Sequence, residues 1–143
     1  MNMDYQTLLK GIFICGLPSV NQVIKKENAS VVIDLRAEAQ QDSYYENVIY
    51  RNFPLIDGGK KQQHILHNAI SEITQFHKEG KQVVLHWKGG KSRTGSVALG
   101  ILLELRIVDS FEKGLQLLKE IRPEIDIHPE FLADLRRLYP NCS

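Results

Sequence analysis

The sequence has few cysteines, no long apolar run and no excess of charge of either sign. Among its 143 residues only Cys15 and Cys142 are cysteines. Two such distant cysteines are too few for a disulfide framework and fit a reducing compartment, so we expect free thiols in a cytoplasmic protein. No stretch approaches the roughly 18 consecutive apolar residues that suggest a membrane-spanning helix, which predicts no integral membrane association.

Charge is nearly balanced, with 18 Lys and Arg against 17 Asp and Glu. A formal net charge of +1 gives no broad electrostatic field for nucleic acid, so any anion site must be local. The chain is long enough for one domain that buries most of its apolar surface. We therefore expect residues 1–143 to form a single domain.

Short β-branched runs alternate with amphipathic segments along the chain. The predicted strands cover residues 12–15, 31–35, 48–53 and 83–85, and the predicted helices cover residues 19–27, 62–77, 93–105, 110–121 and 129–138. Ser19 and Gln22 are typical of a capping box, Ser110 and Pro129 of helix starts, and Pro54 of a strand end. This alternation predicts an α/β fold of three layers, with a central, mainly parallel sheet flanked by helices on both faces.

One loop joins a buried strand directly to a helix, at the carboxyl end of the strand where ligands bind in α/β folds. Gly89 and Gly90 allow backbone N–H groups to turn inward, the helix dipole adds partial positive charge, and Arg93 offers a bidentate fork. The residues predicted to bind phosphate are Lys88, Gly89, Gly90, Lys91, Ser92 and Arg93. The Gly-Lys-Ser order does not make a Walker loop, because Leu85 stands where that motif requires a glycine.

A longer signature surrounds this loop: histidine, cysteine, two residues, glycine, two residues, arginine, then serine or threonine and glycine. The positions other than the cysteine are filled by His86, Gly90, Arg93, Thr94 and Gly95, and Trp87 stands at the cysteine. With this pattern the sequence resembles the protein tyrosine and dual-specificity phosphatase superfamily. The resemblance implies that this chain also has the three-layer α/β fold of that superfamily.

The resemblance extends over most of the chain. Residues 31–36 resemble the strand and turn before the family's acid loop, and residues 53–58 resemble the acid loop itself, which places the general acid on Asp57. Arg122 with Pro123, and Phe131, Leu132 and Leu135 further on, resemble the closing helices.

The resemblance also implies roles for single residues. In this family a cysteine thiolate attacks phosphorus, and Trp87 supplies no thiolate because indole only donates a hydrogen bond. His86 would orient the loop, Thr94 would assist hydrolysis, Asp57 would protonate the leaving oxygen and Arg93 would bind phosphate oxygens. The chain as written is therefore expected to be inactive. The indole ring either occupies the phosphate position or swings outward and leaves the cradle open.

Three functions fit these observations. The first is a pseudophosphatase that binds a phosphorylated ligand without turnover. The second is an active phosphate monoester phosphatase whose nucleophilic cysteine was mutated to Trp87, and the third is a structural interaction module that binds no phosphate. The ligand would be a phosphoprotein or, since Lys88 and Lys91 are similar to lysines of the phosphoinositide-phosphatase branch, a phosphoinositide or inositol phosphate.

Other polar residues have plainer interpretations. Asp34 and Arg36 are expected to form a structural pair at a strand end, and Asp57 beside its glycines also fits a plain turn. His64 and His67 share a helix face at a spacing that metal ligands use, but no third ligand is evident, so neither a metal nor a cofactor is expected.

Overall fold

Five strands form one sheet in the order β1-β2-β5-β3-β4. The computed structural model describes residues 4–38, 45–87 and 91–142. The strands are β1 (Tyr5–Leu9), β2 (Ile12–Gly16), β3 (Val31–Arg36), β4 (Ile49–Leu55) and β5 (Val83–Trp87). Strands β2, β5, β3 and β4 run parallel, and β1 pairs with β2 in the antiparallel sense. The predicted mainly parallel sheet is confirmed.

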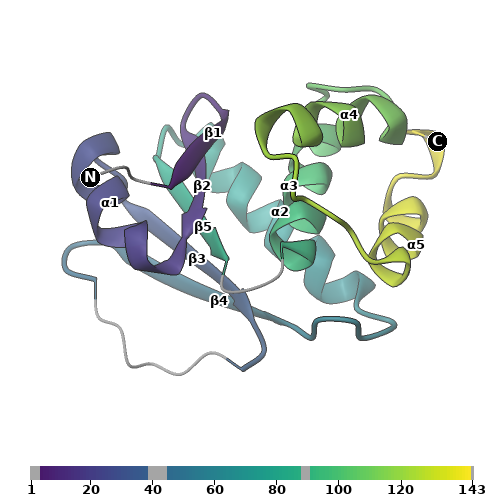
Figure 1. The fold of residues 1–143 in the computed structure, drawn as a ribbon, viewed down its shortest axis with the longest axis horizontal. Helices are drawn as coiled ribbons and strands as arrows, with labels where there is room; N and C mark the ends of the chain where they lie inside the picture. The colour runs from purple at the N-terminus through teal and green to yellow at the C-terminus, as the bar shows by residue number, and fades with distance from the viewer. Residues whose placement is uncertain (1–3, 39–44, 88–90, 143) are drawn as a thin grey trace.

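Helices cover both faces of this sheet. They are α1 (Val20–Glu27), α2 (Gln63–Lys78), α3 (Ser92–Glu104), α4 (Phe111–Ile121) and α5 (Pro129–Leu138), with short 3-10 turns η1 (Leu17–Ser19) and η2 (Pro140–Cys142). Helix α1 lies on one face, and α2 to α5 lie on the other (Figure 1). The predicted three-layer α/β architecture is therefore confirmed.

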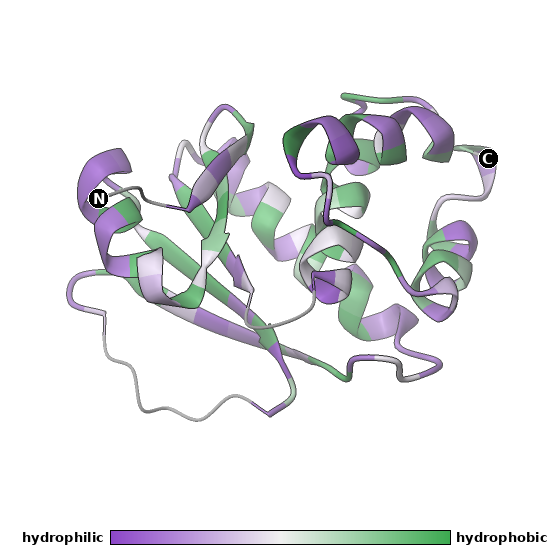
Figure 2. Cartoon of the chain, viewed as in Figure 1, coloured by the Kyte–Doolittle hydropathy of each residue, from purple (hydrophilic) through white to green (hydrophobic). Residues whose placement is uncertain are grey.

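Alternate strand side chains enter two apolar cores. Ile33 and Leu85 belong to the larger core beneath α2 to α5, whereas Val32 and Val84 belong to the smaller core beneath α1. The strands are apolar on both faces, as a sheet covered on both sides requires. Figure 2 shows the same pattern, with apolar residues along the strands and polar ones on the outer helices. Helix α3 is buried along nearly its whole length.

Two local predictions are wrong. Ser19 makes no side-chain cap, because it ends the 3-10 turn η1 with helical backbone angles (φ −95°, ψ −3°) and leads straight into α1. Pro54 does not end its strand, since β4 continues to Leu55. Strand β4 lies at the edge of the sheet, where the missing N–H of a proline is tolerated.

Other signals at the ends of elements are confirmed. The hydroxyl of Ser110 accepts a hydrogen bond from the Lys113 N–H at 3.2 Å, and Pro129 begins α5.

Cys15 and Cys142 are free thiols. In the described part of the chain, each helix is too short or too polar to cross a membrane.

Candidate phosphate site

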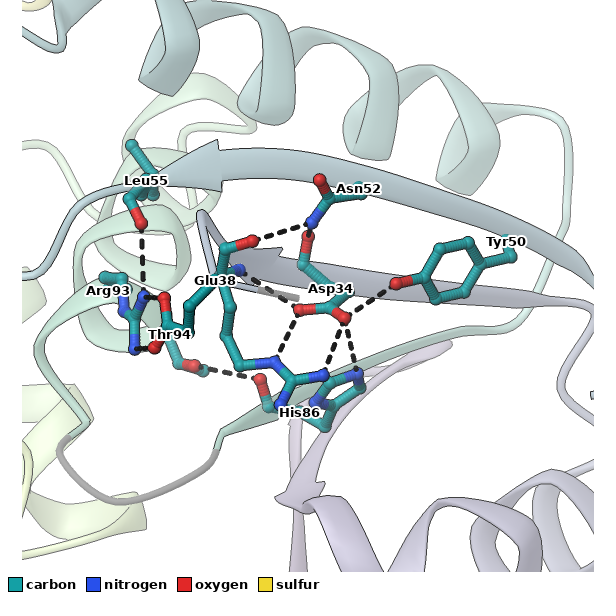
Figure 3. Close-up of polar contacts among 9 residues, drawn as sticks. Asp34, Glu38, Tyr50, Asn52, Leu55, His86, Arg93 and Thr94 are labelled. Atoms are coloured by element: carbon teal, nitrogen blue, oxygen red, sulfur yellow. Dashed lines mark hydrogen bonds and ion pairs between the residues drawn. The ribbon is translucent and has the colours of Figure 1, made fainter. Parts of the chain in front are cut away.

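The carboxyl ends of β3, β4 and β5 meet around the guanidinium of Arg93. Arg93 lies in the first turn of α3 and is only 7% exposed. Its Nη1 donates to Glu38 Oε1 at 2.7 Å and to the Leu55 carbonyl at 3.1 Å, and its Nη2 donates to Glu38 Oε2 at 3.0 Å. Figure 3 shows both partners converging on the guanidinium. A buried fork is thus presented to a two-oxygen anion, which is the geometry that Arg uses for phosphate.

Glu38 is the anion that fills this fork. Its side chain is 63% exposed, so it reaches the buried guanidinium from solvent. The hydrogen bonds from Arg93 lower the pKa of Glu38 to about 2. The carboxylate therefore stays charged at neutral pH and neutralises Arg93 along the edge formed by its two Nη groups.

Two hydroxyl groups fix the start of α3. Thr94 Oγ1 donates to the His86 carbonyl at 3.3 Å, which ties the helix to the end of β5. Ser92 Oγ accepts from the His128 backbone N–H at 2.9 Å, which ties it to the segment before α5. Both side chains are buried. The first turn of α3 is therefore held from two sides.

Asp34 is the centre of a buried polar network beside this site. It accepts from Arg36 through the backbone N–H at 3.1 Å and through Nε and Nη2 at 2.9 Å each, and from the Tyr50 hydroxyl at 2.6 Å. Burial raises the pKa of Asp34, but these hydrogen bonds outweigh it and leave the pKa below its ordinary value. Burial and the bond to Asp34 also raise the pKa of Tyr50. The predicted Asp34–Arg36 pair is confirmed.

His86 is buried next to this network. Its Nε2 lies 4.0 Å from Asp34 Oδ2, and its Nδ1 has no hydrogen-bond partner among the described residues. Burial lowers the pKa of His86 to about 4, although Asp34 opposes the shift. The imidazole is therefore neutral at pH 7.

Trp87 is buried at the end of β5, with 8% of its surface exposed. The guanidinium carbon of Arg122 lies 4.4 Å from the ring centroid, and Lys91 Nζ lies 5.4 Å from it. The carboxylate of Asp4 accepts a hydrogen bond from each Nη group of Arg122, at 2.5 and 3.0 Å. An added Cβ at Gly16 would stand 3.6 Å from the indole nitrogen. The ring thus packs beneath Arg122, towards β2 and the chain's start, while Arg93 faces Glu38 and Leu55.

Asp57 lies in the turn between β4 and α2. Its Oδ1 is 3.0 Å from His128 Nε2, and both side chains are partly exposed. The next residue, Gly58, has a positive φ of 77°, which a glycine adopts without strain. Because His128 also donates its backbone N–H to Ser92, it links Asp57 to the first turn of α3.

The turn that carries Asp57 is clamped by Gln62. The buried side chain of Gln62 accepts from the Ile56 N–H at 2.6 Å and donates to the Ile56 carbonyl at 2.9 Å. The backbone N–H of Gln62 donates to the buried Asp134 at 3.0 Å. Helix α5 and the start of α2 therefore both position the turn.

Several residues predicted from the signature lie at this end of the sheet, whereas Lys88, Gly89 and Gly90 lie outside the described residues. The residues found at this end are His86, Trp87, Lys91, Ser92, Arg93 and Thr94. Asp57 is connected to them by its ion pair with His128. Sequence reasoning missed Glu38, Gln62 and His128. Glu38 lies between the predicted strands 31–35 and 48–53, where no element was predicted, and His128 has no signal beyond its place before Pro129.

The site contains no alternative thiolate among the described residues. Cys15 pairs with His86 across β2 and β5, but it is fully buried. Burial, with a smaller contribution from Asp4, raises the pKa of the Cys15 thiol to about 12, so it stays protonated and unreactive. Cys142 lies beyond α5 in η2. The described residues also contain no group of three or more His, Cys, Asp or Glu placed to hold a metal ion.

Comparison with known proteins identifies the fold. No family model and no curated protein matches the sequence. Among solved structures, the chain is similar to a human tyrosine phosphatase-like serine/threonine/tyrosine-interacting protein (17% identity, 97% of each chain covered, TM-score 0.84). It is also similar to a mouse putative dual specificity phosphatase complexed with zinc tungstate (16% identity, 96% of this chain and 87% of that chain, TM-score 0.83). A third neighbour is PTPMT1 in complex with PI(5)P (18% identity, 95% and 94% covered, TM-score 0.80). The chain therefore has the fold of the dual-specificity phosphatases.

Proposed function

We propose that this chain is a single dual-specificity phosphatase-like domain, spanning residues 1–143, that binds a phosphorylated ligand without hydrolysing it. The observation that carries the proposal is the buried Arg93 fork, which already holds a two-oxygen anion at the start of α3. A helix N-terminus adds backbone N–H groups and partial positive charge to such a site. Trp87 stands at the position of the nucleophile in the signature, and Cys15 cannot replace it because its thiol is buried and protonated.

Residues that serve catalysis in the related enzymes have other contacts in this chain. The Thr94 hydroxyl binds the His86 carbonyl, and Asp57 pairs with His128. Their presence therefore does not require an active enzyme. The name of one structural neighbour, a tyrosine phosphatase-like interacting protein, is consistent with a binding role on this fold.

The surroundings of Trp87 support a native tryptophan over a substituted cysteine. Arg122 covers the ring at 4.4 Å and is itself held by Asp4. An indole buried against a guanidinium gains both apolar burial and a cation–π contact. The alternative is an active phosphate monoester phosphatase whose cysteine was replaced by Trp87, and it rests on the retention of Asp57 and Thr94 at positions that serve catalysis in the resembled family.

The ligand we propose is a phosphoprotein, with a phosphoinositide or inositol phosphate as the second candidate. Ile56 is 59% exposed beside Asp57, so an apolar side chain is available to the organic part of a phosphorylated residue. The second candidate is supported by Lys91, which directly precedes α3 and places its ammonium over the Trp87 ring, and by the neighbour solved with PI(5)P. The two free thiols support a cytoplasmic location.

Titration calorimetry with phenyl phosphate and tungstate tests binding, and release of nitrophenol from p-nitrophenyl phosphate tests hydrolysis. We expect binding without turnover by the chain as it stands, and loss of binding in the Arg93→Lys variant, which keeps the charge but not the fork. Turnover by the unmodified chain would contradict the proposal, and absence of binding would favour the structural module. Turnover by a folded Trp87→Cys variant would favour the enzyme alternative.

A further inference from the structure

The turn that carries Asp57 ends in two cations that the fold leaves without a partner. Lys60 and Lys61 are both exposed, directly before the start of α2. Neither ammonium group has a hydrogen-bond or ion-pair partner among the described residues. Asp57, the one acidic residue of the turn, is already paired with His128 at 3.0 Å. A chain with a formal net charge of only +1 therefore has a local excess of positive charge at this turn.

Helix α5 adds a third cation to the same corner of the molecule. Asp134 accepts from the Gln62 backbone N–H at 3.0 Å through Oδ2 and from Arg137 Nη1 at 2.8 Å through Oδ1. This shared carboxylate holds the Arg137 guanidinium close to the residue that follows Lys61. Asp134 is buried, whereas the Arg137 side chain is 63% exposed. The cation therefore faces solvent while its counter-charge does not.

A hollow of about 430 Å³ lies in this corner, between α2 and α5. Its lining residues are Gln63, His64, His67 and Leu138. Leu138 directly follows Arg137, and Gln63 lies two residues after Lys61, so the cations border the hollow. Leu138 is half-buried and gives it an apolar wall. The hollow therefore has room for an aliphatic side chain next to exposed positive charge.

The backbone of Lys61 is in the left-handed region, with a φ of 57°. This region is unfavourable for a residue with a Cβ, whereas a glycine adopts it without strain, as Gly58 does in the same turn at a φ of 77°. Strain of this kind is found at functional positions when the side chain is needed there. The Lys61 ammonium has no partner among the described residues, so its partner is expected outside the chain.

We propose that Lys60, Lys61, Arg137 and the hollow beside them form a docking surface for the phosphoprotein ligand. The surface binds an acidic segment with an apolar residue next to the phosphorylated one. The exposed cations complement Asp and Glu side chains, and an aliphatic side chain between these acids enters the hollow. The inference rests on the proposed phosphate-binding function and names the class of ligand for it.

The docking surface is continuous with the phosphate site along the turn. Leu55, whose carbonyl accepts from Arg93 Nη1 at 3.1 Å, lies five residues before Lys60. Five residues span at most about 18 Å, and Gln62 folds the turn back by binding both backbone groups of Ile56. A peptide with its phosphorylated residue at Arg93 therefore reaches Lys60 with acidic residues only a few positions away.

Calorimetric titration with three phosphopeptides and with phenyl phosphate tests the docking surface. The first peptide has Asp-Leu-Asp on both sides of a phosphotyrosine, the second has Ser-Leu-Ser there, and the third has Asp-Ser-Asp. The first is expected to bind the unmodified chain about tenfold more tightly than the second and about threefold more tightly than the third. The difference between the first two should shrink as ionic strength rises from about 0.01 to about 0.15 M.

The Lys60→Gln and Lys61→Gln substitutions are expected to weaken binding of the first peptide about threefold each. Binding of phenyl phosphate should not change, because the Arg93 guanidinium is held by Glu38 and Leu55. Lys78→Gln is the matched control, since Lys78 is an exposed lysine in the last turn of α2, at the other end of that helix. Circular dichroism verifies that each variant is folded.

Two results would overturn the docking surface while phenyl phosphate binding kept the proposed function intact. One is equal binding of the three peptides, and the other is a loss in Lys78→Gln as large as in the two turn variants. Vesicles of phosphatidylcholine and a phosphatidylinositol phosphate that bind more tightly than the first peptide, and lose binding in the same two variants, would assign the surface to a lipid headgroup instead. No binding of phenyl phosphate or of any peptide would contradict the proposed function as well.

Discussion

A tryptophan at the end of a central strand needs a specific environment to be stable there. Trp87 has one, since Arg122 and Lys91 lie over its ring and only 8% of its surface is exposed. Arg122 is in turn fixed by Asp4 and Gln6. The residue that prevents nucleophilic chemistry in the proposed function therefore also connects β5, the end of α4 and the start of the chain.

Replacing Trp87 by cysteine is expected to lower the free energy of unfolding by about 2 to 4 kcal/mol. The substitution removes most of a buried indole and leaves a cavity below Arg122. Urea denaturation followed by circular dichroism measures the change, because Trp87 is the only tryptophan and its fluorescence is lost with it.

Trp87→Phe is the matched variant. It keeps an aromatic face for Arg122 and is expected to cost roughly half as much. A Trp87→Cys variant as stable as the unmodified chain would show that the surroundings are not fitted to the indole, and would favour the enzyme whose cysteine was replaced.

At the scale of elements, the turn between β4 and α2 depends on one side chain. The amide of Gln62 closes two hydrogen bonds with the backbone of Ile56, directly before Asp57. Gln62→Ala is expected to lower stability by about 1 kcal/mol, because the Ile56 N–H loses its partner and the Ile56 carbonyl keeps only the bond from the Gly59 N–H. It should also speed amide exchange in the turn.

Gln63→Ala serves as the control, since Gln63 is the next residue and is only half-buried. Hydrogen exchange measured by NMR on both variants separates a local effect on the turn from a general loss of helix α2. Protection of the Ile56 and Gly59 amides that is unchanged in Gln62→Ala would show that the turn does not need the clamp.

The elements that could be predicted are those with a strong local pattern. The β-branched runs of β3 and β5 and the apolar stripe of α2 gave the correct type of element, because local pattern and final burial agree. Strand β1 was missed since it is short and mostly half-exposed. Pro54 gave a wrong strand end, because a proline is tolerated within β4 only since β4 lies at the edge of the sheet. The strand order that puts β4 there cannot be seen in a local sequence pattern.

The residues of the candidate site also differ in whether a local sequence pattern predicts them. His86, Arg93 and Thr94 are close in sequence and could be predicted from one motif. Glu38 and His128 reach the site from segments 55 and 36 residues away from their partners Arg93 and Ser92. Their role follows from which strand and helix ends meet in space, and their own neighbours in sequence carry no sign of it.

At the scale of the whole molecule, the sheet buries an ionisable pair between its two layers of helices. Asp34 and His86 are each 1% exposed, and they pair across β3 and β5. The charge of Asp34 is balanced by Arg36 and the Tyr50 hydroxyl. His86 has to stay neutral for the folded state to keep this arrangement.

Acid is therefore expected to destabilise the fold through His86 before it affects the carboxylates. The pKa of His86 is about 4 in the folded state, lowered from 6.5, so the unfolded chain binds more protons between these values. Stability is fully present above about pH 6.5 and decreases as the pH falls towards 4, by about 3 kcal/mol at most. Asp34 and Glu38, whose pKa values are also lowered, reduce stability only below about pH 4.5.

Urea unfolding at intervals from pH 7.5 to 5, for the unmodified chain, His86→Gln and His64→Gln, tests this window. The His86 variant is expected to lose most of the slope of stability against pH, because its amide has no proton to gain. His64 is exposed on α2 and its replacement should leave the slope as it is. If the slope persists in His86→Gln, the acid sensitivity comes from another group, and the buried neutral imidazole does not control the stability of the sheet.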